Sequence, residues 1–184
     1  MGKRVCPWWI GYFLLLPLRR LGQDPRKLLA PYVREGMTVL EPGPGMGFFT
    51  IDLLQMVGDS GRVIAPDVQA KMLDRLKKRA DKAGVERRLD ARLVSADSMN
   101  LGKIPIVDFT LAFAVVHEFP SAEKFFAEAA AASKPGATLL LAEPTGHVKE
   151  KEFEEELKSA AAAGFRVVDR PRVSRSHAAL LRRN

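Results

Sequence analysis

The sequence predicts an α/β protein with a doubly wound, mainly parallel sheet of seven strands and an antiparallel last strand. Short apolar runs alternate with segments of helical periodicity through most of the chain, which is typical of strands joined by crossover helices. The run at 107–112 is almost continuously apolar, as expected for a central parallel strand covered on both faces. The loop that contains Pro171 joins the last two predicted strands without a helix, so the final strand should run antiparallel to its neighbour.

The first half of the chain gives three helices and three strands. Asp24-Pro25 favours a helix start, because Asp caps well and Pro suits the first helical position, and this helix should reach about Val33. Apolar residues at helical spacing predict a second helix, and a strongly charged segment that ends at Gly84 predicts a third. These two helices are expected at 47–57 and 69–83, and the strands at 38–41, 62–65 and 91–95.

The second half continues the alternation. Ser121 is a suitable N-cap for an alanine-rich helix that should run to about Ser133, with Pro135-Gly136 ending it before the next strand. Gly164 closes the last predicted helix. That helix is expected at 150–163, and the strands of this half at 107–112, 138–143, 165–170 and 177–181.

Length and composition indicate one compact domain. The chain has 184 residues, 47% of them hydrophobic, which is ample for a single core, and no linker or repeat divides it. The single cysteine, Cys6, can form neither an internal disulfide nor a cysteine-zinc cluster. A cytoplasmic location is therefore the default, and no metal site is expected.

The net charge of +7 lies at the two ends of the chain. Residues 1–35 and residues 166–184 each carry +5, so residues 36–165 carry −3. Such basic ends can bind nucleic acid or an anionic lipid surface. Scattered charge of this size is more often a solvated face, so nucleic-acid binding is not expected.

The stretch at 39–50 carries the main functional signal. An apolar run gives way to Glu41-Pro-Gly-Pro-Gly-Met-Gly47 and then to helical periodicity. Glycines let a ligand approach the backbone closely, and the free N–H groups of a following helix favour an anionic or polar ligand. A nucleotide-type cofactor fits this pattern, although an ordinary turn would read similarly.

The spacing of the glycines separates two cofactor classes. A dinucleotide-binding loop needs a third glycine at the position of Phe48, which argues against a nicotinamide-dependent oxidoreductase. Asp67 ends the next apolar run, where a carboxylate accepts hydrogen bonds from both ribose hydroxyls.

Five segments in order resemble the class I S-adenosylmethionine-dependent methyltransferases, of the small-molecule type related to quinone biosynthesis (the type 11 group). The resemblance covers roughly 28–184. Its segments are Glu41 to Gly47, Asp67-Val-Gln-Ala-Lys-Met-Leu73, Ala96-Asp97-Ser98, Phe113-Ala-Val-Val-His-Glu118 and Lys134-Pro-Gly-Ala-Thr-Leu-Leu-Leu-Ala-Glu143.

The resemblance implies a Rossmann-like fold, S-adenosylmethionine as the cofactor and a set of binding residues. Glu41 and the glycine turn would hold the amino-acid end of the cofactor, Asp67 the ribose, and Asp97 the adenine amino group. The full implied set is Glu41, Gly43, Pro44, Gly45, Asp67, Val68, Asp97, Ser98, Phe113 and Ala114. Pro66 lacks an N–H group, so the end of the second strand is expected to diverge from its neighbour.

His117, directly after the fourth predicted strand, is the candidate for taking a proton from the acceptor or orienting it; a structural histidine is the alternative. Glu143 and His147 are expected at the pocket rim. The segment at 113–120 lacks the Asn-Pro-Pro-Tyr type of motif of amino-directed nucleic-acid methyltransferases, and one cysteine does not suit arsenic methylation. A small, apolar acceptor is therefore expected.

The N-terminal segment is expected to serve as a helical lid over the site, with 1–35 as lid and 36–184 as core of one domain. Its uncharged run at 5–18 is shorter than the about 20 residues that span a bilayer, and no signal-cleavage pattern follows it. Trp8, Trp9 and Tyr12 would contact the acceptor. Core packing and peripheral membrane contact are the alternatives, and a non-catalytic binder of nucleic acid or an anionic surface is the alternative for the whole chain.

Overall fold

The computed structural model describes residues 23–104 and 106–184. Its strands are β1 (Thr38–Leu40), β2 (Arg62–Asp67), β3 (Leu89–Leu93), β4 (Val107–Phe113), β5 (Ser133–Pro144), β6 (Phe165–Asp169) and β7 (Ser176–Arg183). They form one seven-stranded sheet in the order β3-β2-β1-β4-β5-β7-β6. Only β7 among these strands runs antiparallel, to both β5 and β6. The predicted fold class is therefore confirmed, including the antiparallel last strand.

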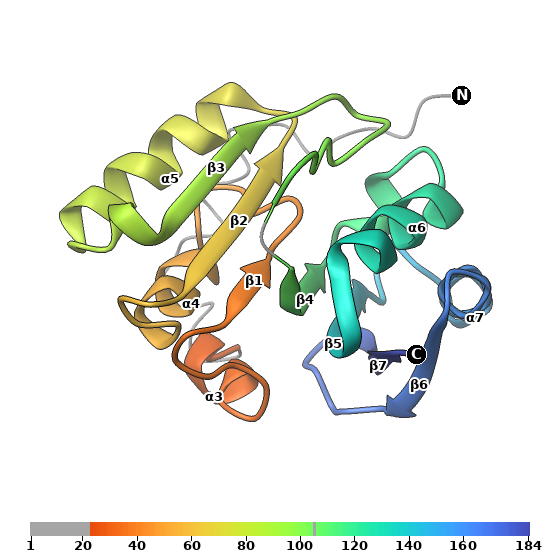
Figure 1. Cartoon of the computed structure of the whole chain (residues 1–184). Helices are drawn as coiled ribbons and strands as arrows, with labels where there is room; N and C mark the ends of the chain where they lie inside the picture. The colour runs from red at the N-terminus through yellow and green to blue at the C-terminus, as the bar shows by residue number, and fades with distance from the viewer. Residues whose placement is uncertain (1–22, 105) are drawn as a thin grey trace.

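Helices cover both faces of this sheet (Figure 1). They are α3 (Pro25–Leu29), α4 (Thr50–Met56), α5 (Ala70–Lys82), α6 (Ala122–Ala132) and α7 (Glu150–Ala162), with short 3-10 turns η1 (Glu86–Arg88) and η2 (Val116–Glu118). Helices α3, α4 and α5 lie on one side, and α6 and α7 on the other. The described helices thus give the two outer layers of a doubly wound fold.

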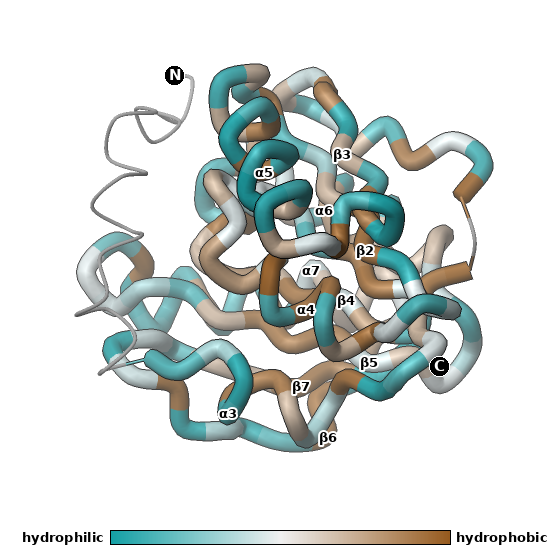
Figure 2. The backbone as a smooth tube through the Cα atoms, turned by 90° about the vertical axis from the view of Figure 1, so that its left-hand side faces the viewer, coloured by the Kyte–Doolittle hydropathy of each residue, from teal (hydrophilic) through white to brown (hydrophobic). Residues whose placement is uncertain are grey.

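Successive residues of the central strands point to opposite faces and so supply two apolar cores. On one face Phe109 and Leu140 pack with Leu53 of α4. On the other, Leu139 packs with Phe125 of α6. Figure 2 shows the hydrophobic residues concentrated along the central strands, whereas α5 is largely hydrophilic on its outer side. The alternation follows from the period of two in a strand.

Two predicted N-caps are present. Asp24 accepts hydrogen bonds from the backbone N–H groups of Arg26 and Lys27 at 3.0 and 3.3 Å. Ser121 accepts one from the backbone N–H of Lys124 at 3.1 Å. Both side chains satisfy N–H groups that the helix itself cannot pair.

Several predicted boundaries are wrong, for identifiable reasons. Helix α3 ends at Leu29 rather than near Val33, because Pro31 has no N–H to continue the helix. Helix α4 begins at Thr50 rather than at Gly47, since Gly47 has a φ of 85°, outside the right-handed helical region.

The predicted start of β5 is also wrong. The strand begins at Ser133, immediately after α6, instead of after Pro135-Gly136. Ser133 already pairs with Val107, and the register then shifts before Thr138 pairs with Phe109. The Pro-Gly pair therefore makes an irregularity inside the strand rather than a loop before it.

The expected divergence at Pro66 does not occur. Strand β2 continues through Pro66 to Asp67, which pairs with Leu93 of β3. The carbonyl of Pro66 accepts a hydrogen bond from the N–H of Gly43 at 2.9 Å. This bond ties the glycine turn to the end of β2.

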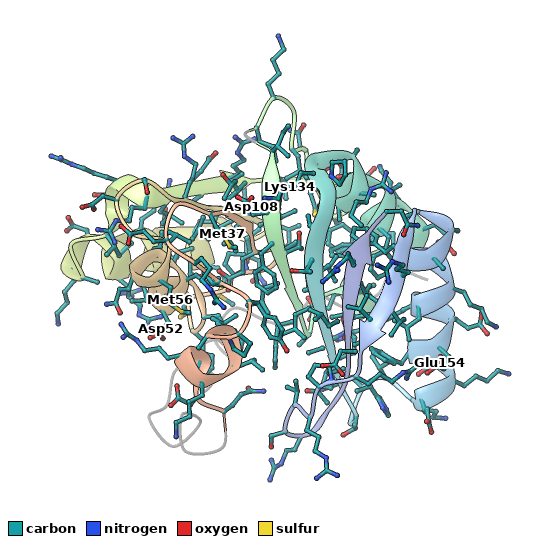
Figure 3. All side chains as sticks on the ribbon, turned by 60° about the horizontal axis from the view of Figure 1, so that its bottom comes forward. Met37, Asp52, Met56, Asp108, Lys134 and Glu154 are labelled. Carbon is teal, nitrogen blue, oxygen red and sulfur yellow. The ribbon has the colours of Figure 1, made fainter. Side chains whose placement is uncertain are left out.

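The amino ends of the central strands are fastened by one side chain. Oδ2 of Asp108 accepts a hydrogen bond from the N–H of Thr38 at 2.7 Å, and Oδ1 pairs with Lys134. Figure 3 shows Asp108 and Lys134 beside each other, on β4 and β5. The carboxyl ends of the same strands are left to form a site.

Strand β6 is an edge of the sheet, and it carries like charges opposite its neighbour. Arg166 lies directly across from Arg182 of β7, and both are exposed. Val167, the next residue of this edge strand, is 42% exposed. Like charges in this position repel each other.

The N-terminal predictions fall largely outside the described residues. Trp8, Trp9 and Tyr12 belong to residues 1–22, which the structure does not describe. Within the range assigned to the lid, Leu29 is fully buried and Val33 is 4% exposed, both in the core beneath the sheet. None of the described helices is long and apolar enough to cross a membrane.

Candidate functional site

The site lies where the loops after β1 and β4 meet. Strand β1 pairs in parallel with β2 on one side and with β4 on the other. The chain therefore builds the sheet outward from β1 in both directions, which makes the gap between β1 and β4 a topological switch point. Ligands of open α/β sheets bind in the crevice at such a switch point, beyond the carboxyl ends of the strands. A Cβ on Gly43 would lie 2.8 Å from Cγ2 of Val115, so only glycine lets the two loops touch.

The three glycines of the turn have separate roles. All have positive φ, 64° at Gly43, 56° at Gly45 and 85° at Gly47, a region that other residues rarely adopt. A Cβ on Gly47 would lie 2.5 Å from Cδ1 of Leu76, whereas one on Gly45 would meet nothing within 4 Å. Gly47 is thus favoured both by its positive φ and by its close approach to Leu76, and Gly45 presents bare backbone to open space.

Asp67 holds this turn in place. Oδ2 of Asp67 accepts a hydrogen bond from the N–H of Gly45 at 3.2 Å, and Oδ1 accepts one from the N–H of Gln69 at 2.8 Å. The residue is only 7% exposed. Burial raises the pKa of its carboxyl, although the N–H donors of Gln69 and Gly45 oppose the shift. Each oxygen keeps a lone pair for a further donor.

Within the part of the chain that the structure describes, Glu41 is a buried acidic residue of the site with an unpaired carboxylate oxygen. It is 4% exposed, and among the described residues its buried Oε2 has no hydrogen-bond partner. Burial raises the pKa of Glu41 to about 8; the nearby hydroxyl of Thr50 opposes this shift, and the charge of Asp67 adds to it. A buried carboxylate without a partner is costly unless a cation or a donor joins it. A positively charged ligand group would therefore be stabilised beside Glu41.

On the other side of the crevice, Glu143 holds the loop after β4. It is fully buried and accepts hydrogen bonds from the N–H groups of Val115 at 3.2 Å and Val116 at 2.8 Å. These bonds support Ala114, which has a φ of 54°, a conformation that costs about 1–2 kcal/mol for a residue with a Cβ. The prediction that Glu143 lies at the pocket rim is wrong, because its carboxylate sits beneath this loop.

His117 lies over Glu143 and beside His147. Its Nδ1 bonds to Oε2 of Glu143, and its ring stacks on that of His147 with centroids 5.8 Å apart. Burial lowers the pKa of His117, but the bond and charge of Glu143, together with Glu118 and Glu156, outweigh this and raise it overall. The structure brings His117 and His147 together, with His147 exposed.

The remaining predicted residues are spread around this centre. Asp97 is exposed; it accepts a hydrogen bond from Oγ of Ser95 at 2.8 Å and pairs with Lys124 at 3.5 Å. Ser98 lines a cavity of about 370 Å³ together with residues of the 100–106 loop and α6, and no residue of the glycine turn lines it. The structure therefore does not join Asp97 and Ser98 to Glu41 directly.

The other predicted cofactor residues flank the crevice. Phe113 is half-buried and packs its ring 4.6 Å from that of Phe49. Pro44 is buried within the turn, Val68 is half-buried just after Asp67, and Ala114 follows β4. In the part of the chain that the structure describes, no cluster of His, Cys, Asp or Glu suits a metal ion.

Comparisons with known proteins agree with this geometry. A family model described as a methyltransferase domain matches residues 33–171, and the chain belongs to this family. It shares 29% sequence identity with a SAM dependent methyltransferase from Aquifex aeolicus, with a TM-score of 0.80, over 97% of this chain and 98% of that one. The class of protein that the sequence predicted is confirmed.

More distant structures share the fold alone. TrmN from Thermus thermophilus has 22% identity and a TM-score of 0.70, over 87% of this chain and 48% of that one. The [4+2]-cyclase SpnF has 19% identity and a TM-score of 0.67, over 96% of this chain and 80% of that one. No match was found among curated proteins.

Proposed function

We propose that this protein transfers the methyl group of S-adenosylmethionine to a small, apolar acceptor. The observation that carries the proposal is Glu41, a buried carboxylate directly before the glycine turn in the chain, whose Oε2 has no partner among the described residues. The cofactor's amino group is the cation that this carboxylate lacks. When bound, the cofactor supplies an activated methyl group on a sulfonium.

The residues of the crevice fit the other parts of this cofactor. The open backbone at Gly45 allows close approach of the amino-acid end. Asp67, whose carboxylate already holds the turn, keeps lone pairs for ribose hydroxyls. Val68 and Phe113 offer apolar surface on either side, and Asp97 and Ser98 are proposed to reach the adenine.

His117 is the proposed catalytic residue, and the acceptor is proposed to bind beside it. His147 would contact the acceptor from the loop after β5, and Trp8, Trp9 and Tyr12 from the N-terminal segment. The apolar nature of the acceptor rests on these aromatic side chains. A cytoplasmic location fits the single cysteine, and peripheral membrane contact through the N-terminal segment is a secondary proposal.

The nicotinamide alternative is disfavoured by Phe48. This residue stands where a dinucleotide loop needs glycine, and it is only 8% exposed, with its ring edge-on to that of Phe49 at 4.9 Å. A helix cannot approach the strand there as closely as glycine would permit. Nucleic-acid binding remains the weaker alternative, supported by the basic ends of the chain alone.

Calorimetric titration tests the proposal. We expect heat of binding from S-adenosylmethionine and S-adenosylhomocysteine, and none from NAD. Glu41→Gln should lower the affinity for S-adenosylmethionine and for S-adenosylhomocysteine. Glu86→Gln, at an exposed site on η1, should leave both affinities unchanged. Tight NAD binding with no heat from S-adenosylmethionine would overturn the proposal.

A further inference from the structure

Glu143 and His117 form a hydrogen-bonded pair whose geometry is fixed from below. Glu143 is fully buried, and the side chain of His117 is 22% exposed. Oε1 of Glu143 is occupied by the backbone N–H groups of Val115 and Val116. Because the backbone holds one carboxylate oxygen, the other is fixed where it meets Nδ1 of His117.

This arrangement selects one tautomer of the histidine. An ionised carboxylate offers only lone pairs, and a neutral imidazole carries a single N–H. Nδ1 of His117 must therefore hold the proton toward Glu143, which leaves Nε2 as a hydrogen-bond acceptor. The ring of His147, stacked at 11° to that of His117, covers one face and limits rotation.

We infer that Glu143 is a positioning residue that holds His117 as a general base acting through Nε2, and that the acceptor carries a phenolic hydroxyl. The inference rests on the proposed methyl transfer. A hydroxyl is a weak nucleophile until its proton leaves. A phenol, with a pKa of about 10, is far closer to imidazole than an alcohol is, so this base suits a phenol. A small, apolar acceptor is compatible with an aromatic ring.

The step balances in atoms and electrons. A lone pair of the phenol oxygen forms the bond to the methyl carbon, and the S–CH3 bonding pair stays on sulfur as a neutral thioether. The O–H proton moves to Nε2 of His117. The imidazolium that results is stabilised by the carboxylate of Glu143 on its other nitrogen.

Other charges around the ring act in the same direction. The negative charges of Glu118 on η2 and Glu156 on α7 also favour the protonated form of His117, as the charge of Glu143 does. His147, from the loop after β5, is a further titratable group in contact with the ring. Together they raise the pKa of His117, so the base is strong but is neutral only above that pKa.

Glu143→Gln is the discriminating variant. Its amide oxygen can still accept from Val115 and Val116, because those donors require an acceptor there. Its amide N–H then faces Nδ1, which must lose its proton, so His117 becomes the Nε2–H tautomer. Nitrogen-detected NMR of the histidine side chains reports both the tautomer and the titration. Such a readout requires no acceptor.

We expect the Nδ1–H tautomer in the wild type, and in Glu143→Gln the Nε2–H tautomer with a lower pKa. Formation of S-adenosylhomocysteine from a pool of simple phenols should fall about 100-fold or more, with affinity for S-adenosylhomocysteine unchanged. His177→Gln is the matched control, since His177 lies directly opposite Glu143 in the sheet and stacks on Phe153 instead. It should change neither measurement.

Four results would overturn the inference: an Nε2–H tautomer in the wild type, an unchanged tautomer and pKa in Glu143→Gln, no phenol turnover by a wild type that binds S-adenosylmethionine, or full turnover in His117→Gln. This last variant leaves the loop bonds of Glu143 in place, so it remains informative if Glu143→Gln does not fold. If the wild type does not bind S-adenosylmethionine, the proposed function fails, and the NMR result still shows whether Glu143 sets the tautomer.

Discussion

Glu41→Gln should make the ligand-free protein more stable at alkaline pH. Burial and the neighbouring Asp67 raise the pKa of Glu41 from 4.5 to about 8 in the folded state. Between these values the unfolded chain has lost the proton and the folded chain keeps it. Stability therefore falls as pH rises, by about 1.4 kcal/mol per pH unit, and the loss is complete above pH 8.

The full shift corresponds to about 5 kcal/mol as an upper bound. Glutamine cannot ionise, so the variant escapes this loss, but its buried amide lacks a partner and costs about 1–3 kcal/mol. At pH 9 the variant should gain roughly 2–4 kcal/mol over the wild type. At pH 6, where folded Glu41 is protonated, the two proteins should differ by less than about 2 kcal/mol.

Urea denaturation at pH 6, 7, 8 and 9 gives these free energies of unfolding directly. Glu86→Gln, at an exposed position, is the control and should follow the wild-type curve. Parallel curves for Glu41→Gln and the wild type across this range would refute the reasoning. The ammonium group of the bound cofactor should favour the ionised form of Glu41. Glu41→Gln should therefore be more stable without ligand at alkaline pH and also bind the cofactor less tightly.

Three further predictions follow from the site. Gly45→Ala should cost about 1 kcal/mol of stability, from its positive φ, and abolish cofactor binding, because its methyl group enters the open space at the turn; Gly84→Ala, with a similar φ and equally open surroundings, should lose only stability. Retained binding in Gly45→Ala would place the cofactor elsewhere. Asp67→Ala should weaken cofactor binding by more than about 1.5 kcal/mol, and unchanged affinity in a folded variant would mean that the ribose is held by another group. Deletion of residues 1–18 should leave a folded domain with weak cofactor binding and no turnover, and amides 8–16 should gain protection from hydrogen exchange when S-adenosylhomocysteine is added; protection equal to that of β4 without ligand would make the segment core instead of lid.

The parts of the fold that local sequence determines were predictable. Continuous apolar runs such as 107–112 identify buried strands, and Asp24 and Ser121 cap helices through their nearest neighbours. Boundaries set by distant groups were not. The start of β5 depends on the pairing of Ser133 with Val107, a residue of another strand.

The same division applies to the site. The glycine turn and Asp67 are contiguous with their strands and could be found by spacing. Glu143 could not be assigned correctly, because its partners, the N–H groups of Val115 and Val116, lie on a neighbouring strand's loop twenty-seven or more residues earlier. In the sequence, Glu143 is marked only by its place at the end of an apolar run. The neighbouring predicted strand is followed by His117 at the same end of the sheet.

The facing arginines on β6 and β7 bear on how molecules of this protein behave toward one another in solution. A free sheet edge invites strands of other molecules to add to it, and positive charge on that edge prevents the addition. Arg166, on the edge strand β6, provides this protection, and its repulsion with Arg182 of β7 costs about 0.2–1 kcal/mol. Concentrated salt, whose screening length at 1 M is about 3 Å, removes the repulsion and the protection together. Each folded molecule then becomes slightly more stable while the solution as a whole becomes more prone to self-association.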